Sequence, residues 1–221
     1  MNSKAASEVV GALMVITLIT TTAGLLYVIA SPVIAQSQES IKLRKAEFDM
    51  LELKEKLERV RFMVETNATY NLRLVGVSAE FKNEPILVID GNTYSISSIR
   101  ISGSGWSVYY ESGAVIERLP SYGKMVSDPM IYYDASTDTL TMPVIMFTGN
   151  KSIGGTGTLT LHFSISNVER ISGNTINLRS DNADVWCDYF IKIGLSPTCT
   201  PNTVTLSTSN TSIVLYEVNV R

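Results

Sequence analysis

The feature that most constrains this chain is an uncharged apolar run near its N-terminus. From Val9 to Ala35 every residue is apolar, small or hydroxyl-bearing, and no charged side chain lies between Glu8 and Glu39. A helix of about 20 such residues crosses the roughly 30 Å hydrocarbon layer of a membrane, whereas the apolar part of a cleavable secretory signal has only about 7–15. The run therefore predicts a membrane-spanning helix rather than a secretory signal peptide.

The residues within and before this run predict its orientation and a role in helix packing. Lys4 is the cation that precedes it, and since positive charge favours the cytoplasmic side, we expect the rest of the chain to lie outside. The run also holds many small residues, among them Gly11, Thr20–Thr22 and Gly24. Small residues let helices approach closely in an apolar environment, so the composition favours helix–helix assembly over a plain anchor.

A second helical pattern follows Pro32, which is expected to kink or break the helix because it removes a backbone hydrogen bond. Apolar residues then keep a 3–4 spacing over three heptads, with charged residues on the other faces. Two interpretations stay open: a helix packed on its own domain alone, or one packed on both its domain and other subunits. Phe48, Leu51 and Phe62 widen the stripe, which favours more than one buried face. The spaced residues are Leu43, Ala46, Met50, Leu53, Leu57, Val60 and Val64.

From Tyr70 onward the hydrophobic period changes from helical to two, which indicates β-strands. Turn residues separate apolar runs at Asp90–Asn92, Glu111–Gly113 and Asp134–Asp138, and each predicts a hairpin. About 150 residues can bury a core of their own. The predicted fold class is α+β: a long N-terminal helix, apolar and then amphipathic, followed by an all-β, sandwich-like head.

The predicted domain boundaries follow from these changes of pattern. Residues 1–5 precede the helix, which is expected to cover 6–66, and the extracellular head covers 67–221; within the helix the apolar core segment is 9–35 and the amphipathic segment 39–66.

Composition excludes most chemistry for the head. The chain has one histidine, two cysteines and a net charge of −3, which disfavours nucleic-acid binding and most metal or redox sites. His162 stands alone in a strand pattern, and Asp134 and Asp138 are better explained by turn chemistry than by calcium binding. We therefore expect no catalytic residues, no metal and no cofactor.

Covalent modification is the chemistry that the head does suggest. Cys187 and Cys199 form an even pair on the predicted outer side, and a disulfide closing that loop would contribute about 3 kcal/mol, so a bond is favoured over two free thiols. Asn-x-Ser/Thr triplets at Asn67, Asn150 and Asn210 are candidate N-glycosylation sites.

The opening stretch resembles the class III signal peptide of archaeal type IV pilins. Lys4-Ala5 corresponds to the end of the leader, and Ala6-Ser7-Glu8-Val9-Val10-Gly11 to the start of the mature chain. The resemblance implies that a prepilin peptidase cuts after Ala5, and that the mature helices form the core of a filament with β-sandwich heads outside. Bacterial type IV pilins place a glutamate fifth in the mature chain; Glu8 would be third, so that charge-pairing role does not carry over.

The sequence thus predicts a structural subunit of an archaeal type IV pilus-like extracellular filament, with surface adhesion as its task and no enzymatic activity. Its expected partners are identical subunits, the prepilin peptidase and pilus assembly machinery, and the membrane before assembly. The alternatives are a single-pass membrane-anchored ectodomain that binds or senses, and a subunit of a swimming filament, the archaellum. The residues assigned to the assembly helix are Glu8, Gly11, Gly24, Pro32, Leu43, Met50, Leu53, Leu57 and Val60.

Overall fold

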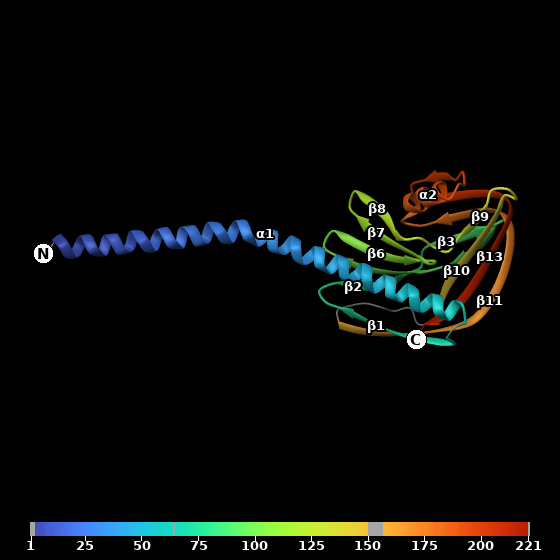
Figure 1. Ribbon diagram of the computed structural model, residues 1–221, viewed down its shortest axis with the longest axis horizontal. Coiled ribbons are helices and arrows are strands. Elements are labelled where there is room, and N and C mark those ends of the chain that lie inside the picture. The colour runs from blue at the N-terminus through green and yellow to red at the C-terminus, as the bar shows by residue number, and fades with distance from the viewer. Residues whose placement is uncertain (1–2, 64, 150–156, 221) are drawn as a thin grey trace. The chain divides into compact units, whose positions relative to one another are not determined.

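A computed structural model describes residues 3–63, 65–149 and 157–220. A long N-terminal helix precedes a domain built mostly of β-strands, which confirms the predicted fold class (Figure 1). The chain divides into two compact units, Met1–Ile41 and Lys42–Arg221. The boundary falls inside the helix, so each unit is described by itself.

Helix α1 covers Ser3–Arg61 and continues through Pro32. The expected break at Pro32 does not occur, and the helix ends at Arg61 rather than at residue 66. Met63 adopts a left-handed backbone with φ of 55°, and its N–H donates to the carbonyl of Val60 at 3.0 Å. A left-handed residue directly after a helix turns the chain away from the axis, which explains why α1 stops here.

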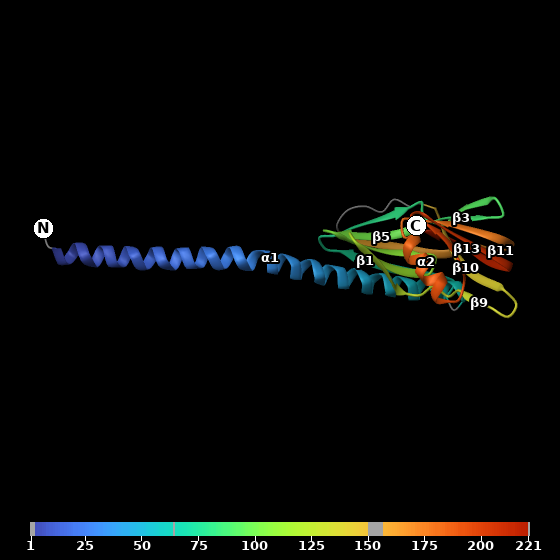
Figure 2. The same cartoon turned by 90° about the horizontal axis from the view of Figure 1, so that it is seen from above.

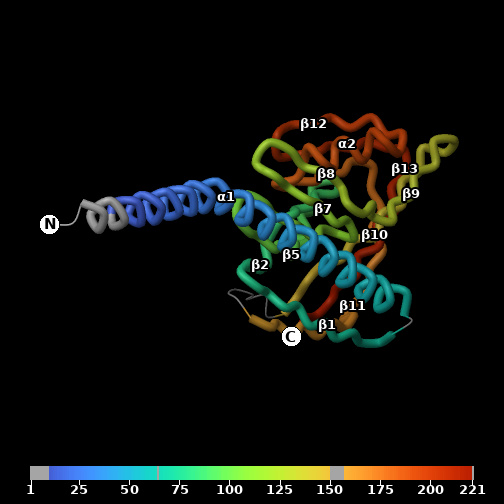
Figure 3. The backbone as a smooth tube through the Cα atoms, turned by 60° about the vertical axis from the view of Figure 1, so that its left-hand side comes forward, coloured from blue at the N-terminus to red at the C-terminus, as the bar shows by residue number. Residues whose placement is uncertain are grey.

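The half of α1 from Lys42 to Arg61 belongs to the same compact unit as the β-strands. Met50, Leu53 and Leu57 are each 1% exposed and share one hydrophobic core with strand residues. Figure 3 shows this part of the α1 backbone alongside the strands of the domain. The predicted boundary at 66/67 is therefore corrected: the compact domain includes the last five turns of the helix, since its core is incomplete without them.

The strands form two sheets that share this core. The eight-stranded sheet has the order β4-β3-β11-β13-β10-β9, with β1 paired to β11 and β12 to β13; the five-stranded sheet has the order β2-β5-β6-β7-β8. The first sheet contains β1 (Asn67–Leu74), β3 (Ile86–Ile89), β4 (Asn92–Ser95), β9 (Tyr132–Asp134), β10 (Thr139–Gly149), β11 (Gly157–Arg179), β12 (Thr198–Thr200) and β13 (Thr203–Val220). The second contains β2 (Ser78–Lys82), β5 (Ser98–Gly103), β6 (Trp106–Glu111), β7 (Ala114–Leu119) and β8 (Tyr122–Ser127).

Strand β6 is buried along its whole length. Val108 and Tyr110 point into the core that contains α1, whereas Tyr109 points into a second core on the other face. A strand covered on both faces needs apolar residues at successive positions, which explains the continuous run from Val108 to Tyr110.

All three predicted hairpins are present, but two features of the head differ from expectation. The run from Tyr94 to Ile101 is divided into β4 and β5, because Ser97 has a φ of 63° and the chain passes there from one sheet to the other. The sequence analysis also missed helix α2, Ala183–Lys192, whose buried Trp186, Tyr189 and Phe190 recur at helical spacing (Figure 2). A disulfide between Cys187 and Cys199 joins α2 to β12, the pairing expected from the sequence.

A buried carboxylate connects α2 to the five-stranded sheet. Glu111, at the end of β6, is 1% exposed and accepts hydrogen bonds from Ser180 Oγ at 3.0 Å, Asn182 Nδ2 at 2.6 Å and Trp186 Nε1 at 2.9 Å. Burial raises the pKa of Glu111, and the three donors partly oppose that rise. The glutamate therefore fixes the corner between β11 and α2 by accepting from three groups at once.

Replacing Glu111 with glutamine should lower the free energy of unfolding by about 1–3 kcal/mol, because an amide donor would then face groups that also donate. Chemical unfolding followed by tryptophan fluorescence measures the change. As a control, Glu80→Gln removes an exposed pair with Arg100 and should cost under about 1 kcal/mol. Equal losses from the two variants would refute the role assigned to Glu111.

Candidate assembly surface

The first half of α1 exposes an apolar surface on all sides. Every residue from 10 to 38 is exposed, and the large apolar residues among them are 55–73% exposed. In the described part of the chain, one helix is long and apolar enough to cross a membrane. An apolar surface of this extent marks contact with a membrane or with another protein.

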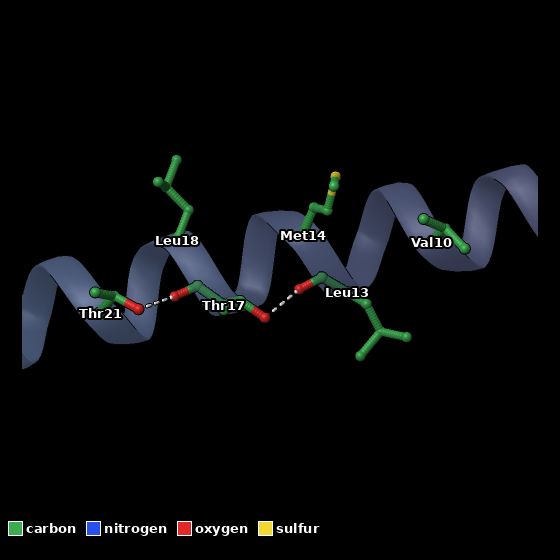
Figure 4. Close-up of a pocket in the computed structure, with 6 residues that line it drawn as sticks. All are labelled: Val10, Leu13, Met14, Thr17, Leu18 and Thr21. Atoms are coloured by element: carbon green, nitrogen blue, oxygen red, sulfur yellow. Dashed lines mark hydrogen bonds between the residues drawn. The ribbon is translucent and has the colours of Figure 1, made fainter.

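The threonines in this segment satisfy their own hydroxyl groups. Thr17 Oγ1 donates to the carbonyl of Leu13 at 2.8 Å, and Thr21 Oγ1 donates to that of Thr17 at 2.7 Å (Figure 4). Thr20 and Thr22 donate in the same way, to Ile16 and Leu18. A hydroxyl paired within its own helix needs no water. The threonines therefore keep the helix surface compatible with a dry environment.

The glycines in this segment have no packing role within the chain. A Cβ atom added at Gly11 or at Gly24 would meet no atom within 4 Å. Glycine lowers helix stability by about 1 kcal/mol relative to alanine, and nothing in this unit requires it at either position. Close approach by a second helix would require it, because small residues let two backbones come together.

The second half of α1 carries a narrow apolar stripe that faces away from the β domain and that continues into Phe62, the residue directly after the helix, whose N–H donates to the carbonyl of Glu58 at 2.9 Å. We call Phe48, Leu51 and Phe62 the outer stripe; they are 65%, 37% and 59% exposed. At 100° per residue they lie within about 60° of one another and roughly opposite the buried stripe of Met50, Leu53 and Leu57. The helix thus has two apolar faces, of which its own domain covers one.

This result corrects the residues assigned to assembly in this half of the helix. Met50, Leu53, Leu57 and Val60 are each 1% exposed, and Leu43 packs against the same core. They belong to the domain interior, because their shared helix face lies on the chain's own strands. The outer stripe, which the sequence analysis took as a widening of that face, is the surface left for a partner.

Polar contacts fix the rotation of this half of the helix, and hence the direction of the outer stripe. Lys54 is 8% exposed, and its Nζ donates to Ser127 Oγ at 2.7 Å and to the carbonyl of Asp128 at 2.6 Å. Burial lowers the pKa of Lys54, which nearby Glu58 partly opposes. On the same helix Asp49 accepts a hydrogen bond at its carbonyl from Tyr70 Oη at 2.8 Å.

The other candidate residues do not gather into a site. His162 is exposed on β11, and its Nδ1 lies 3.0 Å from Thr69 Oγ1. Asp134 accepts bonds from Ser136 and Thr137, and Asp138 accepts from Ser209, so these aspartates serve turns. Within the described residues no group of three potential metal ligands comes together.

The remaining predicted positions divide between exposed and undescribed residues. Asn67 and Asn210 are exposed, at the start of β1 and within β13, whereas Asn150 lies outside the described residues. Lys4, Ala5, Ala6 and Glu8 lie in α1, but their side chains are outside what the structure describes. Leader cleavage therefore stays a prediction.

The chain is thus an α+β protein in which one apolar N-terminal helix of membrane-spanning length leads into a two-sheet domain. It belongs to the Family of unknown function (DUF7289), whose model matches residues 4–221. It is similar to an uncharacterized protein of Archaeoglobus fulgidus. The two sequences are 28% identical over an alignment of 221 positions, which covers 87% of this chain and 83% of that protein. No solved structure matches the chain.

A substitution on the buried face of Lys42–Arg61 should lower the free energy of unfolding much more than one on the exposed face. Leu53→Ala should lower the free energy of unfolding by about 2–5 kcal/mol, because it leaves a cavity in the core. Phe48→Ser, on the outer stripe, should change it by less than about 0.5 kcal/mol. Chemical unfolding of the full chain in detergent, followed by tryptophan fluorescence, compares the two variants. A loss above about 2 kcal/mol for Phe48→Ser would contradict an outward-facing stripe.

Proposed function

We propose that this protein is a structural subunit of an archaeal type IV pilus-like filament and that it assembles through α1. The observation that carries the proposal is the fully exposed apolar segment from residue 10 to residue 35. At 1.5 Å per residue this segment is about 39 Å long, more than the roughly 30 Å that a bilayer requires. The excess length favours a role beyond anchoring.

Three further features of the helix support assembly over simple anchoring. Gly11 and Gly24 leave open helix surface at positions where a partner backbone could approach. The threonine hydroxyls are paired within the helix, so transfer from lipid into a bundle of like helices would leave none of these hydroxyls unpaired. The outer stripe extends the available apolar surface beyond the segment that a membrane would cover.

The mechanism follows from these surfaces. The precursor is inserted in the cell membrane with Lys4 on the cytoplasmic side, and a prepilin peptidase removes the leader after Ala5. The helix then leaves the bilayer for a bundle of identical helices, aided by the pilus assembly machinery. One face of each subunit packs against a different face of the next, and such head-to-tail contacts build an open helical filament. The β domain lies outside and supplies the surface that adheres; the protein is not an enzyme.

The second candidate is a single-pass membrane-anchored ectodomain that binds or senses. The same apolar helix favours it, because the segment would anchor a domain equally well. The two candidates differ in what they require of the helix surface. A membrane anchor would tolerate Leu or Ile in place of Gly24, and polar residues in the outer stripe, whereas a helix bundle would not. An archaellum subunit would need the same packing, and swimming assays distinguish it from an adhesive pilus.

Gly24→Asp should reduce filaments sheared from cells by at least about ten-fold, because a carboxylate within a dry helix bundle would have no partner. Electron microscopy and immunoblotting of the sheared fraction measure the loss. Gln38→Asp, which places the same charge on the exposed helix beyond the apolar segment, should leave filament abundance within about two-fold.

Phe48→Ser combined with Phe62→Ser tests the outer stripe in the same assay. Filaments should decrease while the β domain keeps its stability. Normal filament abundance in both Gly24→Asp and the double serine variant would contradict assembly through these surfaces, and absence of the unaltered protein from the sheared fraction would favour the membrane-anchored ectodomain instead.

A further inference from the structure

A cleft of about 310 Å³ lies between helix α2 and β8, the edge strand of the five-stranded sheet. The two elements are in contact and lie side by side in the domain (Figure 1). Sites for small molecules have volumes of roughly 300–1,000 Å³, so the cleft is large enough for one small ligand. None of its lining residues belongs to the outer stripe or to the apolar half of α1, so it is separate from the assembly surface.

The inner surface of the cleft is apolar. Val185 and Tyr189, one turn apart on α2, line it and are 4% and 5% exposed. Met125 of β8 is half-buried and packs against the same core. Gly123 lets β8 and α2 meet, because a Cβ atom there would lie 2.7 Å from Val185 Cγ2. The side chain of Tyr122 is 49% exposed and adds an aromatic ring to the lining.

The walls of the cleft are fixed by contacts within the chain. Tyr189 Oη donates a hydrogen bond to the carbonyl of Pro129 at 3.2 Å. The disulfide between Cys187 and Cys199 holds α2 to β12, and the bonds to Glu111 hold its first turn to the five-stranded sheet. A site with fixed walls loses little conformational freedom when a ligand binds.

The charged groups of the lining are mostly paired within the chain. Lys192 Nζ lies 2.7 Å from Asp128 Oδ2, and Lys124 forms an ion pair with Glu117. Asp188 is exposed and forms no ion pair with another described residue; it lies one helical turn from Lys192. A cationic ligand at Asp188 would therefore approach Lys192, and an anionic ligand at Lys192 would compete with Asp128. The lining favours an uncharged ligand that forms hydrogen bonds.

A sugar ring has the chemistry that this lining requires. Its C–H groups form an apolar face that can pack on the ring of Tyr122 and on the inner surface of the cleft. Its hydroxyl groups both donate and accept, so they can donate to the carboxylate of Asp188 and accept from Lys192. A wholly apolar ligand would cover these polar groups without pairing them, at a cost in affinity.

We propose that the cleft between β8 and α2 binds an uncharged sugar unit of a polysaccharide or glycan. This site goes beyond the proposed function and holds equally for a filament subunit and for a membrane-anchored ectodomain. A single sugar has few atoms, so we expect a Kd of about 1 mM for one unit. A filament would repeat the site along its length and so bind a polymeric ligand much more tightly than one subunit does.

Ligand-detected NMR, with calorimetry for the Kd, tests the proposal. The full-length protein is kept in a detergent without a sugar headgroup, and glucose, galactose, mannose and N-acetylglucosamine are added to about 20 mM. At least one should bind with a Kd of about 1 mM. The uronate and the amino form of the sugar that binds should each bind at least about five-fold more weakly, because each brings a charge to a lining whose charges are paired.

Variants at the cleft test its location. Tyr122→Ala and Asp188→Ala should each weaken binding of the sugar by at least about five-fold, because they remove the ring and the free carboxylate. Tyr132→Ala and Glu169→Ala are the matched controls, since both side chains are exposed and lie outside the cleft; their Kd should change by less than about two-fold. An unchanged near-ultraviolet circular dichroism spectrum shows that each variant is folded.

Saccharides released from the surface of the producing cells form a second arm, which distinguishes a sugar of the cell's own surface from a foreign one. Binding in either arm that is lost in both cleft variants supports the proposal. Binding of no neutral saccharide in either arm, tighter binding of the charged forms, or equal binding by both cleft variants overturns it. The Kd should be the same in Gly24→Asp protein, so that failure of the cleft and failure of helix assembly are separate results.

Discussion

The β domain buries one face of the helical half from Lys42 to Arg61, and the remaining surfaces of α1 are defined by what that burial leaves out. Met50, Leu53 and Leu57 complete the core that the strands begin. Lys54 fixes the rotation of the helix through its bonds to the loop after β8. Since one face is fixed inward, Phe48, Leu51 and Phe62 must face outward. If the helix were rotated about its axis, it would bury these three apolar side chains and expose Met50, Leu53 and Leu57.

The N-terminal half of α1 has the opposite property, because its own chain covers none of its described surface. Its threonine hydroxyls are paired internally, and a Cβ atom at Gly11 or Gly24 would meet no neighbour. Such a surface is stable only in lipid or against another apolar surface. The proposed filament uses both environments in succession.

Sequence patterns that extend over many residues predicted the fold class, whereas features set by one or a few residues were not predicted. The uncharged run and the change from helical to two-residue periodicity are properties of many residues at once, so the helix and the β domain could be predicted. The break between β4 and β5 at Ser97 could not be predicted, because a single residue with positive φ takes the chain from one sheet to the other without any change in composition. Helix α2 was missed because its apolar residues lie within a strand-rich region, although Val185, Trp186, Tyr189 and Phe190 follow a helical spacing.

The candidate surface was predictable only in part for the same reason. Periodicity shows that a helix has an apolar stripe, but not which of two stripes its own domain covers. The sequence showed that Phe48 and Phe62 widen the stripe of Met50 and Leu53 and favour more than one buried face, but only the structure shows that the domain covers Met50 and Leu53 and leaves Phe48 and Phe62 exposed.

The central claim is that α1 leaves the membrane as a processed helix and enters a filament. The most direct measurement is the N-terminal residue of the protein in a sedimentable fraction sheared from cells, determined by mass spectrometry of its N-terminal peptide. The account predicts Ala6 as that residue. Protein found only in detergent-extracted membranes, with Met1 still present, would contradict it.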